Sequence, residues 1–248
     1  MGVIYALWQR QLKRFYRQKS RVIGSIAQPL LFLVALGFGF GSIFQEAGRG
    51  SYIQFLVPGI IAMSILFSSI FSGIEIIWDK QFGFLKETLV APVSRLRIMI
   101  GRTLGGATIA VLQGLLILII SFAFGFKLNN LALLPLAILF MILTAIVFTA
   151  LGTAIASRLN DMQGFQLLMN LLIMPLFFLS GALFPLTDLP KAINFIIRIN
   201  PLTYCVDAIR YFLTSMSSIP IFVSSIVIVS YLIIFVFIGS YLFSRMEI

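Results

Sequence analysis

Residues 131–157 read LALLPLAILFMILTAIVFTALGTAIAS, a stretch without a single charged side chain. A helix needs about 20 mostly apolar residues to cross the hydrocarbon core of a bilayer. This stretch is longer than that, so it predicts a transmembrane helix rather than the core helix of a soluble domain.

The rest of the chain has the same character, with 60% hydrophobic and 10% charged residues among 248 and a mean hydropathy of +1.07. Soluble domains average about 45–50% apolar and about 25% charged residues, which excludes a soluble enzyme and a disordered chain. We predict an all-α integral membrane protein with six spans. They are roughly Val22–Phe44, Ile53–Ile77, Ile98–Phe126, Leu131–Ser157, Gly164–Leu186 and Ile219–Phe243. No stretch between them could bury a core of its own, so residues 1–248 form one transmembrane domain.

The 18 basic residues against 8 acidic ones predict the orientation. Thirteen of the basic residues fall in the N-terminal stretch, in the loop between the second and third spans, and at Arg158 and Arg245. Five fall on the other side. Because cytoplasmic loops collect Lys and Arg, we expect both termini in the cytoplasm and a multi-pass protein of the cytoplasmic membrane. The membrane accounts for the basic excess, so nucleic acid is not an expected partner.

Residues 1–21 read as an amphipathic interfacial helix. Ile4, Tyr5, Trp8, Leu12, Phe15 and Tyr16 share one arc at 100° per residue, and the basic residues Arg10, Lys13, Arg14 and Arg17 lie opposite. Such a helix lies along the inner leaflet, with its cations toward lipid phosphates and the cytoplasm. It is either a plain membrane anchor or also a surface that packs against a cytoplasmic partner.

Residues 78–97 form an unusual cytoplasmic connector. Phe82, Phe84, Leu85 and Leu89 are mixed with Lys86 and Glu87 before Ala91-Pro92 ends the run. Apolar side chains exposed among charges on a short helix indicate a docking surface for another protein. The alternative is that the rings dip into the inner leaflet.

Residues 187–218 lie outside the spans and are still half apolar. Pro190 suits the first turn of a short helix, and Asn200-Pro201 gives an N-cap followed by proline at the first position of a second helix that runs to about Leu213. Asp207 and Arg210, three residues apart, are expected to pair. We predict two short helices that re-enter the outer leaflet; a hairpin lying on the surface is the alternative.

The sequence contains no phosphate loop, no His and one cysteine, Cys205, so no catalytic, cofactor or metal residue is predicted. Gly101 and Gly105, one turn apart, read as a close helix–helix contact, as do Gly37 and Gly41. The substrate-facing stripe is expected in the fifth span. It comprises Gln166, Asn170 and Phe177, near Pro175.

Three stretches together resemble the type-2 ABC exporter permeases, typified by daunorubicin-resistance and nodulation exporters. The stretches are the basic N-terminal helix, the loop GFLKETLVAPVSR (83–95), and the outer segment with LSGALFP (179–185), Leu189-Pro190 and NPLTYCVDAIR (200–210). The resemblance implies a permease that pairs with a second copy and binds two copies of a separate ATPase, which holds Mg-ATP. It also implies that residues 82–89 are the helix coupled to that ATPase, and that Lys191–Leu213, after Pro185, form re-entrant outer helices.

Two other classes of function remain open at this point. An intramembrane enzyme acting on lipids would need carboxylates, His or Cys converging at one depth, and a sensor or scaffold would not transport at all. The cargo stays open among drugs, lipids and lipid-linked glycans, since 25 Phe residues suit each of them.

Overall fold

The computed structural model describes residues 2–47, 50–84, 93–186 and 190–246. These residues form helices and no β-strand, which confirms the all-α membrane fold. In chain order the elements are α1 (Gly2–Arg17), α2 (Lys19–Gly39), α3 (Gly41–Glu46), α4 (Tyr52–Phe71), α5 (Ile74–Gln81), α7 (Arg95–Ala123), the 3₁₀ turn η1 (Leu131–Leu133), α8 (Leu134–Ala156), α9 (Met162–Phe178), α10 (Lys191–Ile199), α11 (Pro201–Thr214) and α12 (Ile221–Ser244).

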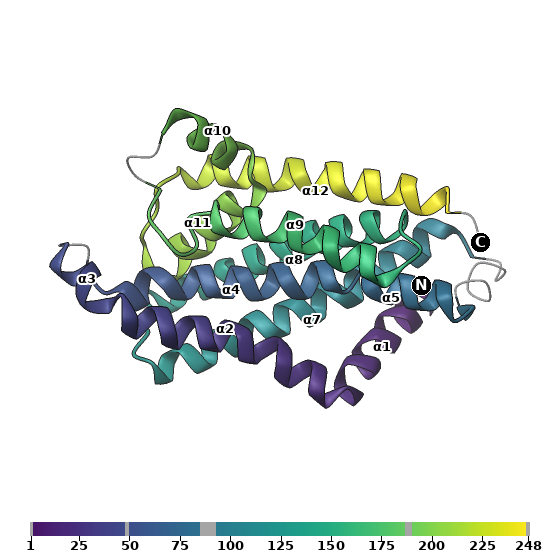
Figure 1. The fold of residues 1–248 in the computed structure, drawn as a ribbon, viewed down its shortest axis with the longest axis horizontal. Helices are drawn as coiled ribbons and strands as arrows, with labels where there is room; N and C mark the ends of the chain where they lie inside the picture. Colours follow the sequence, from purple (N-terminus) through teal and green to yellow (C-terminus); the bar gives the residue numbers. More distant parts are fainter. Residues whose placement is uncertain (1, 48–49, 85–92, 187–189, 247–248) are drawn as a thin grey trace.

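The long helices run side by side along the longest axis of the molecule (Figure 1). Both chain termini lie at one end of this bundle, which we call the inner end, while α3 and α10 lie at the opposite, outer end (Figure 1). α4 is the central helix, because it packs against α2, α7, α8, α9 and α11 and is buried over most of its length. α1 is inclined to the bundle and meets α2 at an elbow.

Five of the six predicted spans correspond to helices long and apolar enough to cross a membrane. They are Val22–Gly39, Tyr52–Gln81, Arg95–Ala123, Leu131–Ala156 and Ile221–Ser244. The second is interrupted at Ser72 and Gly73, between α4 and α5. A methyl group added to Gly73 would come within 2.5 Å of the Gly152 carbonyl oxygen. The backbone of α8 is therefore in direct contact with the backbone of this interruption.

The fifth predicted span, Gly164–Leu186, is only partly helical. α9 is shorter than the other spans and ends at Phe178, three residues after Pro175. Beyond it Gly181 adopts a left-handed backbone with φ +73°, a conformation that glycine reaches without steric cost. The apolar residues that follow therefore extend the hydrophobic run of the sequence without extending the helix.

The non-helical residues 179–186, which we call the outer strap, lie inside the bundle against α4. Ala182 and Leu183 are buried, and a methyl group on Gly59 would come within 2.1 Å of the Ala182 carbonyl oxygen. Non-helical backbone among apolar helices needs hydrogen-bond partners from the protein. The Tyr52 hydroxyl donates to the Leu183 carbonyl at 2.9 Å, and Arg210 donates to the Gly181 carbonyl at 2.8 Å.

Candidate functional site at the inner end and in the central cavity

α1 docks directly onto α7 through two glycines. A methyl group on Gly101 would lie 3.1 Å from the backbone of Ile4 and from Leu7, and one on Gly105 would meet Gln11. The predicted close contact at these glycines is confirmed, and its partner is the N-terminal helix. Of the other pair, Gly37 makes an ordinary contact with Ile53, whereas Gly41 has nothing within 4 Å.

The docking seam divides α1 into three sides. Leu7 and Gln11 face α7, and the Trp8 indole N–H donates to the Thr108 hydroxyl at 3.0 Å. Tyr5 and Tyr16 are exposed on one flank. The basic residues occupy the other flank, which faces α5. The amphipathic pattern that the sequence predicts is therefore present, but the protein itself receives part of the basic side.

Asp79 of α5 collects three guanidinium groups. Arg102 of α7 binds its Oδ2 at 2.5 Å, while Arg10 and Arg14 of α1 lie 3.2 and 3.6 Å from its Oδ1. Arg102 and Asp79 are both buried. A buried charge is tolerated only when it is paired, so this cluster fixes α1, α5 and α7 to one another. The sequence analysis did not identify Asp79. A usable signal was present, because the predicted topology puts this acidic residue at the same membrane interface as the four cations of the N-terminal helix.

The start of the connector between α5 and α7 contacts the same two arginines of α1. The Arg10 guanidinium lies 5.7 Å from the centre of the Phe84 ring, and that of Arg14 lies 4.9 Å from Trp78. Phe82 and Phe84 remain 72% and 50% exposed. The other predicted coupling residues, Leu85, Lys86, Glu87 and Leu89, lie outside the described part of the chain.

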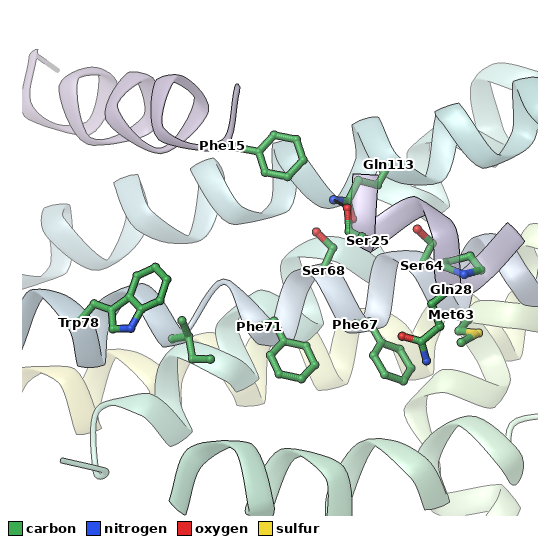
Figure 2. A pocket seen from close by; sticks show the side chains of 13 residues that line it. Phe15, Ser25, Gln28, Met63, Ser64, Phe67, Ser68, Phe71, Trp78 and Gln113 are labelled. Atoms are coloured by element: carbon green, nitrogen blue, oxygen red, sulfur yellow. Dashed lines mark hydrogen bonds between the residues drawn. The ribbon is translucent and has the colours of Figure 1, made fainter. Parts of the chain in front are cut away.

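A cavity of about 420 Å³ lies between α2, α4, α5 and α7, with the end of α1 at its border. It is lined by Phe15, Gly24, Ser25, Gln28, Pro29, Met63, Ser64, Phe67, Ser68, Phe71, Ile74, Trp78 and Gln113. In Figure 2 the serines of α4 and Gln113 point to one side, and the rings of Phe67 and Phe71 point to the other. The lining is therefore apolar with one stripe of neutral polar groups.

Part of this polar stripe lacks partners within the described protein. The Gln113 amide donates to the Ser25 hydroxyl at 2.6 Å, but the Gln113 Oε1 and Ser64 Oγ atoms are buried without a hydrogen bond. Buried polar atoms are nearly always satisfied, so unsatisfied ones beside a cavity mark a place where a ligand or water can bind. The volume falls within the range of about 300–1,000 Å³ typical of ligand sites.

The residues predicted as a substrate stripe do not line this cavity. Gln166 and Asn170 are exposed on α9, and Phe177 is buried among the rings of Phe32 and Phe67. Phe67 does line the cavity, so Phe177 lies one ring behind its wall. The serines and glutamines of α2, α4 and α7 were missed because the sequence does not specify how each helix is rotated about its axis.

At the outer end α10 and α11 form the predicted pair of short helices. Pro190 precedes α10, and the Asn200 side chain accepts from the Leu202 N–H at the start of α11. Its amide also donates to the Leu176 carbonyl at 2.7 Å, so it caps the C-terminal end of α9 as well. Pro201 takes the first helical position, as predicted.

Asp207 and Arg210 make no direct ion pair in the described structure, although the charge of Asp207 still stabilises the Arg210 guanidinium. Arg210 stacks on the Phe55 ring at 4.0 Å and donates to the Phe55 and Gly181 carbonyls. Asp207 accepts from the backbone N–H groups of Ser218 and Ile219 instead. Both side chains are buried, and backbone groups of the outer strap and the α11–α12 turn outcompete the local contact. With Pro185 they line a second, outer pocket of about 210 Å³.

Comparison with known proteins gives the same family throughout. Residues 2–214 match the model of the ABC-2 type transporter family. The chain is 31% identical to the transport permease named ycf38 of Cyanophora paradoxa over 84% of its length, covering 73% of that protein. It is 30% identical to nodulation protein J of Rhizobium leguminosarum bv. trifolii, over 83% of this chain and 79% of that one. It is 26% identical to the inner membrane transport permease YadH of Escherichia coli K12, over 93% and 90%.

The matched region contains α1, the inner cluster, the cavity and both outer helices, so every part of the site lies within it. The chain belongs to the ABC-2 type transporter family, as a transport permease subunit embedded in the membrane.

Proposed function

We propose that this permease is the membrane subunit of an ATP-driven exporter that moves a hydrophobic or amphipathic substrate outward through the cytoplasmic membrane. The central cavity carries the proposal. It combines aromatic walls with neutral hydrogen-bonding groups between four helices of an apolar bundle, which is the composition expected of a site for such a substrate.

The energy source is proposed to be a separate ATPase at the inner end, which we place in the cytoplasm on the charge distribution. The chain has no phosphate loop. The exposed rings of Phe82 and Phe84 offer a partner apolar area, and the Asp79 cluster ties that region to α1 and α7. Movement of the docked partner would thus reach the helices that border the cavity.

The experiment measures ATP hydrolysis and transport by the purified subunit, alone and with its companion ATPase, in proteoliposomes. Hydrolysis is expected only with the companion, and substrate transport should follow it. Ser68→Leu, which adds bulk at the cavity wall, should abolish stimulation by substrate. Ser230→Leu makes the same change at an exposed position of α12 and should not. ATP hydrolysis by the rigorously pure subunit would contradict the proposal.

A second copy of the chain is proposed as the permease partner. α9 presents the exposed polar side chains Gln166 and Asn170 on a mostly apolar helix, a costly arrangement against lipid. In a Cys205→Ala background, Asn170→Cys should form a disulfide between two copies under mild oxidation. Phe237 is 74% exposed on α12, and the Phe237→Cys variant should form no such disulfide. Equal cross-linking of both variants would show random collision and remove the support for this interface.

A further inference from the structure

A basic recess lies at the inner end, beside the cavity. It has a volume of about 560 Å³ and lies between α1 and the end of α5. It is lined by Ala6, Gln9, Arg10, Lys13, Arg14, Arg17, Gln18, Trp78, Asp79, Phe82 and Phe84. Nothing in the docking of α1 on α7 requires this recess, because the docking seam is on a different side of the helix.

The recess has more positive charge than its carboxylate can balance. Among the described residues, four cations line it against one acid, Asp79, which also serves the buried Arg102 behind it. Glu75 lies in the adjoining pocket with Arg102 and has a partner of its own. Lys13 and Arg17 make no hydrogen bond or ion pair with any described residue. The recess is therefore matched to an added anion.

The recess and the cavity are neighbours with a common wall. The Trp78 ring lines both, and Phe15 of the cavity lies in the same turns of α1 as Lys13, Arg14 and Arg17 of the recess. Figure 2 shows Trp78 and Phe15 toward one end of the cavity, away from Met63 and Gln28. A molecule with an anionic head in the recess can therefore place its apolar part in the cavity. There the unsatisfied Ser64 hydroxyl can donate to an ester oxygen, and the Gln113 Oε1 can accept from a hydroxyl group or a water.

We propose that the recess and the cavity together bind one anionic amphiphile, with a phosphate-type headgroup among Arg10, Lys13, Arg14 and Arg17 and an apolar chain between α2, α4 and α7. This inference rests on the proposed function and narrows its substrate class. Uncharged and cationic drugs fit the cavity alone and leave the recess unfilled.

The binding test uses the purified full chain in neutral detergent, with Trp8→Phe so that Trp78 is the sole tryptophan reporter. Dioctanoyl phosphatidic acid should shift the Trp78 emission, whereas dioctanoylglycerol and inorganic phosphate should bind much more weakly. Lys13→Gln with Arg17→Gln should weaken the phosphatidic acid about tenfold or more, since each surface cation contributes attraction to an anionic lipid. These two residues have no hydrogen-bond or ion-pair partner among the described residues, so the fold should persist. Lys19→Gln with Arg97→Gln removes the same charge from exposed positions of the inner end outside the recess and should change little.

Several outcomes would overturn the assignment. Equal binding of inorganic phosphate would show a site for a free anion, and equal losses in the two double variants would show a general charge effect. Loss of ATPase association in the Lys13/Arg17 variant, with lipid binding intact, would make the recess a protein-docking surface. Binding without stimulation of ATP hydrolysis by the assembled transporter would identify a resident lipid instead of a substrate.

The failure of this inference and that of the proposed function are distinguishable. An assembled complex that hydrolyses ATP and transports another compound, but does not bind phosphatidic acid, refutes the substrate class alone. A chain that binds phosphatidic acid in the recess and never activates an ATPase refutes the exporter instead.

Discussion

Gly59→Ala should loosen the outer strap from α4. The added methyl group would lie 2.1 Å from the Ala182 carbonyl oxygen, whereas ordinary contacts begin at 3.4 Å, so the strap must retreat by the difference of about 1.3 Å. The clashing atoms belong to the backbone of Ala182 and cannot rotate away. A retreat of that size would break two hydrogen bonds to the strap. The Arg210 guanidinium now donates to the Gly181 carbonyl oxygen at 2.8 Å, and the Tyr52 hydroxyl donates to the Leu183 carbonyl oxygen at 2.9 Å.

The cost follows from these terms. Overpacking of this kind typically costs about 1–3 kcal/mol, and the greater helix propensity of alanine returns about 0.5–1 kcal/mol. We expect a net loss of about 1 kcal/mol of unfolding free energy, or about 2–4 °C in Tm for a chain of this size. Thermal unfolding of the purified protein in detergent measures it.

Gly37→Ala is the matched control, because it makes the same change in another apolar helix, α2. Its methyl group would meet the Ile53 side chain at an ordinary distance of 3.5 Å. That variant should unfold at the wild-type temperature or slightly above it. Adding Ala182→Gly to Gly59→Ala should not restore stability, because the clash is with backbone. If Gly59→Ala and Gly37→Ala unfold at the same temperature, the close approach of the strap to α4 is refuted.

Three further outcomes are expected. Asp79→Ala leaves the buried Arg102 without its partner and should cost about 3–5 kcal/mol, seen as a lower Tm and as faster proteolysis of α1; unchanged proteolysis would mean that the seam on α7 suffices. Phe84→Ala and Glu87→Ala should insert normally yet bind the companion ATPase about tenfold or more weakly in a pull-down titration, because a buried Phe contributes about 1.5–3 kcal/mol; normal export by both would favour the lipid-facing alternative. Cys205 is buried, so a test of the topology needs new thiols in a Cys205→Ala background. Lys191→Cys should react with an impermeant maleimide from outside intact cells, and Arg158→Cys should react only after lysis. The reverse pattern would show the opposite orientation.

The sequence predicted the helical content and the place of five spans because uncharged runs of about 20 residues have one stable conformation in a bilayer. It overshot at the fifth, since residues 179–186 are as apolar as the helix before them. What makes them non-helical is tertiary: Gly59 admits their backbone, and Tyr52 and Arg210 satisfy it. The expected pair of Arg210 and Asp207 also rested on local spacing alone. The carbonyl groups to which Arg210 donates lie 29 and 155 residues away in the chain, where local spacing cannot find them.

The candidate site was predicted in part. The basic arc of α1 and the aromatic start of the connector could be recognised, because both are one-dimensional patterns. The cavity could not, because its serines and glutamines come from three helices and converge only once those helices are packed. The stripe of Gln166 and Asn170 stays a prediction, now placed on an exposed face of α9.

The docking of α1 also constrains how the protein is made. Its partners come late in the chain: Asp79 lies 69 residues after Arg10, and Thr108 lies 100 residues after Trp8. At about 5–20 residues per second, a ribosome needs roughly 5–20 s to deliver them. Throughout that interval the nascent α1 has a basic flank and an aromatic flank but no protein to receive them, and the leaflet surface is the environment that suits both. The amphipathic pattern thus suits the helix to stay at the leaflet surface until the third span is inserted and α7 is there to receive it.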